Sequence, residues 1–225
     1  MILGITERRS REKDQRRHAI LKAAKSLIAR HGVEGMSMNQ LAASTELNKA
    51  TLYLYFKDKD DLVDAIVYEG LVLLEKEYQQ AEPQGLSGFD KVLNHVRTTF
   101  AFYKKYPVYF YTLNHQERRK AADRRDTPFA AKGDEVAVRI FDRIAEGVRQ
   151  GIKEGSIRQA IEVNMFLVLL YAQIYGVTHT IYAKEDIYKD AFNLDPATIE
   201  KTALEIIEYY LKSGHGARSK GLVIP

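Results

Sequence analysis

Residues 37–53 carry the signals of two very short helices separated by only three residues. Ser37 and Gln40 have the spacing of a capping box, in which two side chains satisfy free backbone N–H groups at a helix start. Asn48 is a good N-cap for a second helix, which leaves residues 45–47 as the turn. Two short helices joined in this way form a helix-turn-helix, whose second helix enters the major groove of DNA.

Helical periodicity extends over most of the remaining chain. Apolar residues from Ile20 onward recur at intervals of three and four, which predicts a helix over 20–31 that Gly32 ends in a left-handed conformation. The other predicted helices cover 58–80, 87–103, 107–115, 134–153, 160–183 and 196–212. Unpatterned charges predict a mobile loop over 116–133, and residues 214–225 are expected to form a flexible tail. No segment has the alternation of a strand, so the predicted fold class is all-α.

The outward face of the second short helix carries polar side chains suited to DNA. Side chains near its front would contact bases in the groove: Asn48, Lys49, Ala50, Thr51 and Leu54. Hydroxyl and ammonium groups further along would bond phosphates: Tyr53, Tyr55, Lys57 and Lys59. From the preceding helix we expect contributions from Ser37, Met38 and Gln40. The alternative is a plain helical hairpin in which both tyrosines belong to the core.

Positive charge is concentrated at the N-terminal end. Residues 1–60 carry 12 basic and 7 acidic side chains, whereas residues 61–225 carry 22 and 23. A basic head on a nearly neutral body suggests a polyanionic partner. The side chains expected to follow the DNA backbone or enter the minor groove are Arg8, Arg9, Arg11, Arg16 and Arg17. The alternative is a solvated, disordered tail.

Residues 38–62, MNQLAASTELNKATLYLYFKDKDDL, resemble the TetR family of bacterial transcriptional regulators. The family pattern of a small residue, Thr, Leu-Tyr, any residue, Tyr-Phe, Lys, any residue, Lys, an acid and Leu is met from Ala50 to Leu62, and the resemblance covers Ile20 to Ile66. Two positions depart from the family: Glu46 stands at the usual turn glycine, and Ala50 stands where glycine is frequent.

The resemblance implies an obligate homodimer of all-helical subunits that binds a pseudo-palindromic double-stranded operator. Each subunit would combine a three-helix DNA-binding domain, expected at 1–60, with a larger ligand-binding and dimerisation domain, expected at 61–213. The matching positions imply phosphate contacts by Tyr53, Tyr55 and Lys57, and groove-facing positions for Lys49, Ala50, Thr51 and Leu54.

Aromatic residues dominate the body of the chain, with 14 tyrosines and 9 phenylalanines in the whole sequence. Many tyrosines suit an amphipathic cavity, although for any single one a core position is the plainer interpretation. The candidate contacts to a small hydrophobic or aromatic effector are Tyr103, Phe110, Phe141, Phe166, Tyr171 and Tyr175, with His115 and His179 as hydrogen-bonding groups. The candidates for the dimer seam are Ile199, Ala203, Ile206, Ile207 and Tyr210, which an intramolecular core explains nearly as well.

Other function classes find little support. The sequence has no glycine-rich phosphate loop, His-Glu-x-x-His motif or nucleophile elbow, so we expect no enzyme, no catalytic residue and no cofactor. The six histidines include no pair four residues apart, and without cysteine no metal site is expected. We expect a cytoplasmic protein with no membrane partner, since the start lacks a signal peptide and the apolar segment 163–177 is short and interrupted by polar residues. A ligand-responsive repressor is the expected function; a constitutive DNA-binding protein and a ligand-binding protein without DNA activity are the alternatives.

Overall fold

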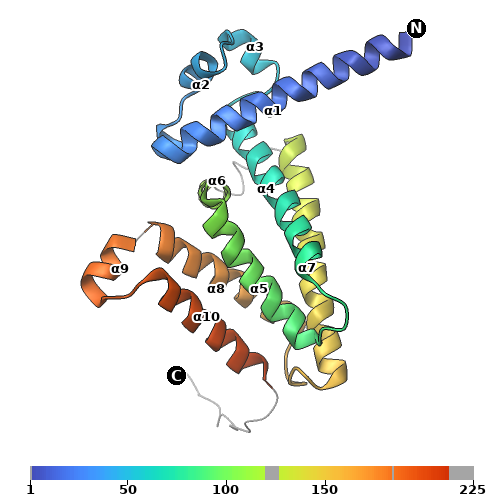
Figure 1. Cartoon of the computed structure of the whole chain (residues 1–225), viewed down its shortest axis with the longest axis vertical. Helices are drawn as coiled ribbons and strands as arrows, with labels where there is room; N and C mark the ends of the chain where they lie inside the picture. Colours follow the sequence, from blue (N-terminus) through green and yellow to red (C-terminus); the bar gives the residue numbers. More distant parts are fainter. Residues whose placement is uncertain (1, 120–126, 184, 213–225) are drawn as a thin grey trace, which may run out of the picture. The chain divides into compact units, whose positions relative to one another are not determined.

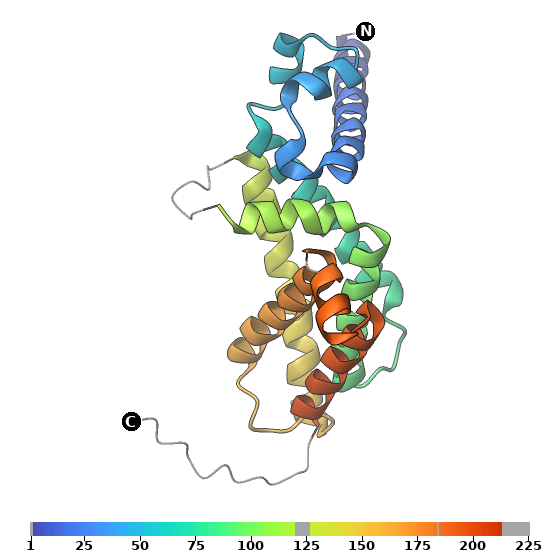
Figure 2. The same ribbon diagram turned by 90° about the vertical axis from the view of Figure 1, so that its left-hand side faces the viewer.

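The structure, a computed structural model, describes residues 2–119, 127–183 and 185–212 (Figures 1 and 2). Within these ranges the chain forms ten helices and no strand, which confirms the all-α class. In chain order the helices are α1 (Ile2–Gly35), α2 (Met38–Ser44), α3 (Lys49–Tyr53), α4 (Lys59–Ala81), α5 (Gly88–Lys105), α6 (Pro107–Glu117), α7 (Pro128–Glu154), α8 (Val163–Ala183), α9 (Glu185–Phe192) and α10 (Pro196–Leu211).

The chain divides into two compact units. The N-terminal unit combines Met1–Gln79 with Thr99–Ile140, and the C-terminal unit combines Gln80–Thr98 with Phe141–Pro225. Helices α4, α5 and α7 therefore contribute residues to both units. The functional division expected after residue 60 stays a prediction.

The first helix is much longer than the sequence predicts. Its apolar periodicity begins at Ile20, yet α1 begins at Ile2, so the basic N-terminal stretch is helical rather than a loose tail. Gly32 adopts the expected left-handed conformation, with φ of 70°. Its ψ of 170° is not helical, so the regular helix ends at Gly32 as expected, and a further short helical turn after this kink reaches Gly35.

Side-chain caps place α2 and α3 where the sequence predicts them. The backbone N–H of Gln40 donates to the Ser37 hydroxyl at 3.2 Å, and the Gln40 side chain accepts from the Ser37 N–H at 2.9 Å, which confirms the capping box. Asn48 caps α3 by accepting the N–H of Thr51 at 2.7 Å. Between the two helices Glu46 takes φ of 55°, a left-handed conformation that glycine adopts without steric cost.

Apolar side chains from the first four helices and the α3–α4 connection close the core of the N-terminal unit. The apolar residues of these elements with no measurable exposure are Ile20, Ala24, Leu41, Leu52, Phe56, Leu62, Val63 and Ile66. Complete burial of an aliphatic or aromatic side chain contributes about 1.5–3 kcal/mol. The recognition motif is therefore fixed from behind by α1 and α4, and its outer face is available for a partner.

The loop predicted over 116–133 is too long at both ends. Helix α6 continues to Glu117 and α7 already begins at Pro128, while residues 120–126 lie outside the described ranges. Thr127 explains the early start of α7, because its hydroxyl accepts the backbone N–H three residues further on at 3.1 Å. Proline at the first helical position completes this start signal.

Glycines allow α5 and α7 to cross closely in the C-terminal unit. A Cβ atom on Gly88 would lie 2.1 Å from the backbone nitrogen of Gly151 and 2.3 Å from the carbonyl oxygen of Gly147. No side-chain rotation relieves a clash with backbone atoms. The N–H of Gly88 donates to the Glu154 carboxylate at 2.6 Å, which ties the start of α5 to the end of α7.

Helix α8 is less buried than the sequence predicts. The segment Val163–Tyr182 is long and apolar enough to cross a membrane by length and composition, with a mean hydropathy of 1.3, and 28% of it is buried. Met165, Val168 and Leu169 are 57%, 62% and 52% exposed. Helix α8 is thus buried over only part of its surface. Helix α9 is not among the predicted helices, although Ile187, Tyr188, Ala191 and Phe192 recur at helical spacing within its eight residues.

Candidate nucleic-acid interface and effector region

Helix α3 separates inward from outward side chains as a recognition helix must. Leu52 is fully buried, whereas Tyr53 is 41% and Leu54 is 78% exposed. Lys49 is also exposed, and its ammonium lies 5.8 Å from the centre of the Tyr53 ring. Exposed apolar and polar side chains from the first residue to the C-cap of a short helix suit contacts to base edges in a major groove.

Helix α2 contributes less to the surface than expected. Ser37 and Gln40 are exposed, but their side chains hold each other in the capping box. Met38 is 9% exposed and packs inward, so its side chain is a packing residue and not a surface contact. The sequence alone could not show this, because the register of the cap directs Met38 toward the core.

Two lysines follow the recognition helix in different states. The Lys57 side chain is exposed, while its backbone N–H donates to the carboxylate of Asp61 at 2.9 Å and so fixes the end of the motif. The Lys59 ammonium donates to the backbone carbonyl of Glu34 at 3.2 Å. Tyr55 is half-buried. Of these three side chains, that of Lys57 is the most accessible in this structure.

Arg16 and Arg17 occupy different sides of α1. Arg16 is exposed. Arg17 lies 3.2 Å from Asp14, and its guanidinium lies 5.8 Å from the ring centre of Phe129. That ring in turn lies 6.2 Å from the ring of Phe56. Arg17 therefore faces the start of α7.

The side chains predicted to contact an effector fall into two groups, one in each compact unit. Tyr103, Phe110 and His115 belong to the N-terminal unit, and the other five belong to the C-terminal unit: Phe141, Phe166, Tyr171, Tyr175 and His179.

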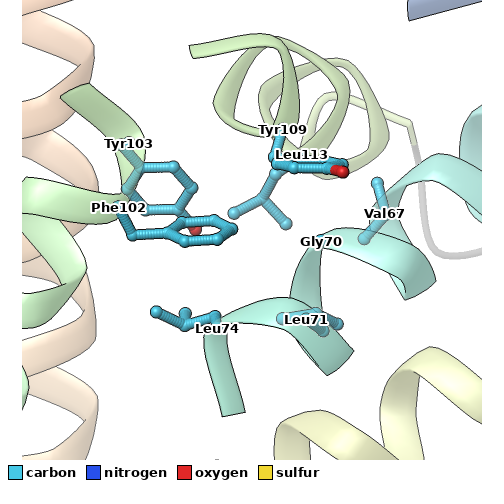
Figure 3. A pocket seen from close by; sticks show the side chains of 8 residues that line it. All are labelled: Val67, Gly70, Leu71, Leu74, Phe102, Tyr103, Tyr109 and Leu113. Atoms are coloured by element: carbon cyan, nitrogen blue, oxygen red, sulfur yellow. The ribbon is translucent and has the colours of Figure 1, made fainter. Parts of the chain in front are cut away.

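A small cavity of about 10 Å³ lies between α4, α5 and α6 in the N-terminal unit (Figure 3). This volume holds about one water molecule. Its lining is apolar apart from two tyrosines, and consists of Val67, Gly70, Leu71, Leu74, Phe102, Tyr103, Tyr109 and Leu113. Tyr103 is thus placed at a cavity, and Phe110 packs beside it with ring centroids 5.4 Å apart.

Tyr109 joins this cavity to two other helices. Its hydroxyl donates to the Glu69 carboxylate of α4 at 2.9 Å and accepts from the Lys25 ammonium of α1 at 3.2 Å. Lys25 and Glu69 also form an ion pair with each other. Burial and then the neighbouring Glu69 charge raise the pKa of the Tyr109 phenol, which keeps it a neutral donor. Gly70 leaves the room for this ring, since a Cβ there would lie 2.8 Å from Tyr109 Cδ1.

His115 lies at a polar junction and not in the cavity. Its Nδ1 is 3.0 Å from Glu34 at the end of α1, and its Nε2 is 3.5 Å from Asp60 at the start of α4. Just beyond, the guanidinium of Arg119 pairs with the buried carboxylate of Asp64. Side chains at the C-terminal end of α6 and just beyond it therefore form ion pairs with α1 and α4, the two helices that flank the helix-turn-helix.

The aromatic side chains of the C-terminal unit stack along α8. The ring of Tyr171 lies 6.0 Å from Phe141 and 6.1 Å from Tyr175, which in turn lies 6.2 Å from the imidazole of His179. Tyr171 is 36% exposed, so this row is only partly covered. Phe166 is buried and stacks on Tyr210 of α10 instead.

The C-terminal unit also contains a buried histidine. His95 is 2% exposed, and burial lowers its pKa to about 4 despite the nearby carboxylate of Glu82. Glu82 also accepts a hydrogen bond from Arg143 at 2.7 Å and lies 3.3 Å from Lys91. Burial therefore keeps His95 neutral, while Arg143 and Lys91 neutralise the Glu82 carboxylate.

Sequence reasoning missed the residues that connect the cavity to α1. Lys25, Glu69 and Gly70 are not among the candidates, and Tyr109 is noted only as one of many aromatics. Lys25 and Tyr109 are 84 residues apart, and no local pattern announces their contact. Only Gly70, a glycine within an otherwise periodic helix, gives a signal of close packing.

Relatives in sequence match only the N-terminal region. Residues 20–66 match the family model described as bacterial regulatory proteins, tetR family. A protein of Haemophilus influenzae described as an uncharacterized HTH-type transcriptional regulator is 34% identical over 68 residues, which are 28% of this chain and 36% of that protein. An HTH-type transcriptional regulator of Staphylococcus aureus is 30% identical over 76 residues, or 34% and 41% of the two chains. The match thus spans well under half of these curated relatives.

Solved structures share the fold over most of the chain. The transcriptional regulator FadR from Bacillus subtilis, in complex with stearoyl-CoA, superposes with a TM-score of 0.66 at 17% identity, covering 86% of this chain and 98% of that one. AibR, in complex with isovaleryl coenzyme A and operator DNA, gives a TM-score of 0.64 at 21% identity, covering 85% and 97%. Residues 20–66 therefore match the TetR family of bacterial regulatory proteins, and the whole chain shares the all-helical fold of the solved regulators.

Proposed function

We propose that the protein is a sequence-specific, DNA-binding transcriptional regulator. One observation carries the proposal: α3 is capped, anchored by the buried Leu52, and presents Lys49, Tyr53 and Leu54 outward. A helix-turn-helix needs this arrangement to place side chains against base edges.

The outer residues divide between two tasks. Lys49, Ala50 and Thr51 at the front of α3, and the exposed Leu54 at its C-cap, would contact bases, with the lysine donating to guanine and the methyl groups touching thymine. Tyr53, Tyr55, Lys57 and Lys59 would bond phosphates and fix the orientation. For Lys59, binding would require exchange of the Glu34 carbonyl for a phosphate oxygen.

The functional unit we infer is a homodimer that binds a pseudo-palindromic operator. Helix-turn-helix dimers place two recognition helices about one DNA turn apart. An apolar surface suited to dimerisation lies on α8 and α10, with Leu169, Ile206 and Tyr209 52%, 55% and 75% exposed. Of the predicted seam, Ile206 and Tyr210 are exposed and suit this role, whereas Ala203 and Ile207 are buried within the chain. Asn164, exposed near the start of α8, makes lipid a poor partner for the same surface.

The effector we infer is a small, largely apolar or aromatic compound. The apolar cavity between α4, α5 and α6 and the stacked aromatics of α8 support this class. FadR and AibR, which share the fold, were solved with stearoyl-CoA and isovaleryl coenzyme A. Thioesters with an acyl chain are therefore the first compounds to test, followed by free fatty acids and aromatic acids.

Tyr109 offers a route from effector to DNA. A group entering the cavity would displace this ring, and with it the hydrogen bonds to Lys25 of α1 and Glu69 of α4. A ligand changes DNA affinity only through different affinities for the two shapes of the protein. A coupling of about 1–3 kcal/mol, or roughly 5–150-fold in operator affinity, is the usual scale. Release of the operator on effector binding would make the protein a repressor.

Selection from a pool of random duplexes tests the DNA-binding proposal. We expect enrichment of a pseudo-palindrome bound at least about 10³-fold more tightly than unrelated DNA at the same salt concentration. Titration of that complex with the compounds above then tests the effector. Equal affinity for selected and unrelated duplexes would contradict the proposal.

A constitutive DNA-binding protein is the second candidate. The small volume of the cavity favours it, since about 10 Å³ admits no effector without rearrangement. Specific operator binding that no compound in the panel alters would support this alternative. Tight binding of a compound without any DNA affinity would point instead to a ligand-binding protein.

A further inference from the structure

Residues 7–16 of α1 are helical although their side chains have no cover from the rest of the described chain. All side chains from 7 to 16 are exposed, and this stretch holds five basic and three acidic residues. A helix that is polar on every side gains no stability from a core and is marginal on its own. Such a segment is suited to a charged partner that the free protein lacks.

Two of its arginines lie on the side of the helix-turn-helix. Lys25 marks the side of α1 that faces α4 and α6, because its ammonium bonds Glu69 and Tyr109. At about 100° per residue, Arg16 lies about 180° and Arg9 about 160° around the helix from Lys25. Figure 1 shows α2 and α3 on this far side of α1. Arg9 and Arg16 therefore lie on the same side as the recognition motif.

The acidic residues of the stretch leave these two arginines without an ion-pair partner. Glu12 lies 3.5 Å from Arg8, and Asp14 lies 3.2 Å from Arg17. Within the part of the chain that the structure describes, no carboxylate lies within 4.0 Å of the guanidinium of Arg9 or Arg16. Both groups are free to pair with an anion.

We propose that the N-terminal part of α1 is a rigid arm that lies along the phosphate backbone of the duplex outside each operator half-site. The proposal rests on the DNA-binding function proposed above. Residues 2–19 form about 27 Å of helix at about 1.5 Å per residue, which corresponds to about eight base pairs of duplex at about 3.4 Å each. Arg9 and Arg16 bond phosphates from fixed positions two turns apart, and guanidinium matches phosphate in geometry as well as charge. The arm lengthens the footprint without reading sequence.

Two charge-matched double variants test the arm. Arg9→Gln with Arg16→Gln removes the proposed phosphate contacts, whereas Arg8→Gln with Arg11→Gln removes the same charge from other sides of the helix. Each variant and the wild type is titrated with the selected operator carrying either 2 or 12 base pairs of flanking duplex, over a series of salt concentrations. Circular dichroism and the ratio of monomer to dimer in solution verify that each variant folds.

For the wild type we expect at least tenfold tighter binding to the long-flanked duplex. The Arg9/Arg16 variant should lose this gain, with a salt slope shallower by about 3–4 for the four arginines of a dimer at about 0.9 per contact. The Arg8/Arg11 variant should retain most of the gain in affinity for the long-flanked duplex. Specific binding whose affinity does not depend on flank length, or an equal loss of the affinity gain in both variants, would contradict the proposed role of the arm. Neither result would contradict the proposed DNA-binding function. Failure to bind any duplex specifically overturns both.

Discussion

Replacing Gly70 by alanine should displace Tyr109. The new Cβ would lie 2.8, 2.9 and 3.1 Å from Cδ1, Cγ and Cβ of Tyr109. Carbon atoms pack best at about 3.5–4.0 Å, and the contacts include the stem of the tyrosine rather than only a flexible end. Relief therefore requires movement of the ring or of α6 as a whole, which breaks the hydrogen bonds to Glu69 and Lys25.

The magnitude follows from two opposed effects. Overpacking of a well-packed site costs about 1–3 kcal/mol, and alanine in place of a helical glycine returns about 0.5–1 kcal/mol. Gly70→Ala should thus lower the free energy of unfolding by about 1–2 kcal/mol. Gly133→Ala is the matched control, because its Cβ would meet only Leu71 Cδ1 at an ordinary 3.8 Å. That variant should be more stable than the wild type by about 0.5–1 kcal/mol.

Urea unfolding of the three proteins at one protomer concentration measures both differences. Gly70→Ala should also show a changed response to any effector that acts through the cavity. A Gly70→Ala protein as stable as Gly133→Ala would show that Tyr109 moves without cost, and the tight contact could then not transmit a ligand signal to α1.

Two further predictions concern the C-terminal unit. Ile206→Asp places a charge on the exposed face of α10, so it should sediment as a folded monomer with weakened operator binding. If Ile206→Asp left the dimer unaffected, the dimer interface would lie on another surface. Ile207→Ala empties a buried position and should instead cost about 2–5 kcal/mol of stability. Burial holds His95 neutral, with a pKa of about 4 in the folded protein against 6.5 in the unfolded chain. The contribution of the neutral imidazole to the free energy of unfolding is therefore complete above about pH 6.5. It is lost as the pH falls toward 4, by about 3 kcal/mol in total. Unfolding at a series of pH values should show this slope in the wild type and not in His95→Gln.

Local chemistry made the DNA-binding motif predictable. Ser37, Gln40 and Asn48 satisfy backbone groups within three residues of themselves, so their pattern survives in a single sequence. Gly32 adopts the expected left-handed conformation for the same reason. The start of α7 was missed although Thr127 gives a local signal, because the charged residues before it suggested a longer loop.

The effector region was far less predictable. Of the predicted effector contacts only Tyr103 lines the cavity, and the residues that tie the cavity to α1 come from distant segments, because only the folded chain brings Lys25 to Tyr109. His115 shows the converse: a histidine on an aromatic-rich helix suggests a ligand, yet Glu34 and Asp60 surround it. Helical spacing gives the face of a residue and not what covers that face.

The most direct test of sequence-specific recognition by α3 is a base-pair scan of the selected operator. Affinities are measured for every single base-pair substitution with the wild type, with Lys49→Ala and with Lys57→Ala. Recognition by α3 predicts that Lys49→Ala relaxes the preference at one or two positions by about 1–3 kcal/mol each. Lys57→Ala should weaken binding to all sequences alike and make the salt slope shallower by about one unit for each phosphate that the lysine no longer neutralises. If both variants changed only the overall affinity and left every base preference intact, α3 would not be the recognition helix.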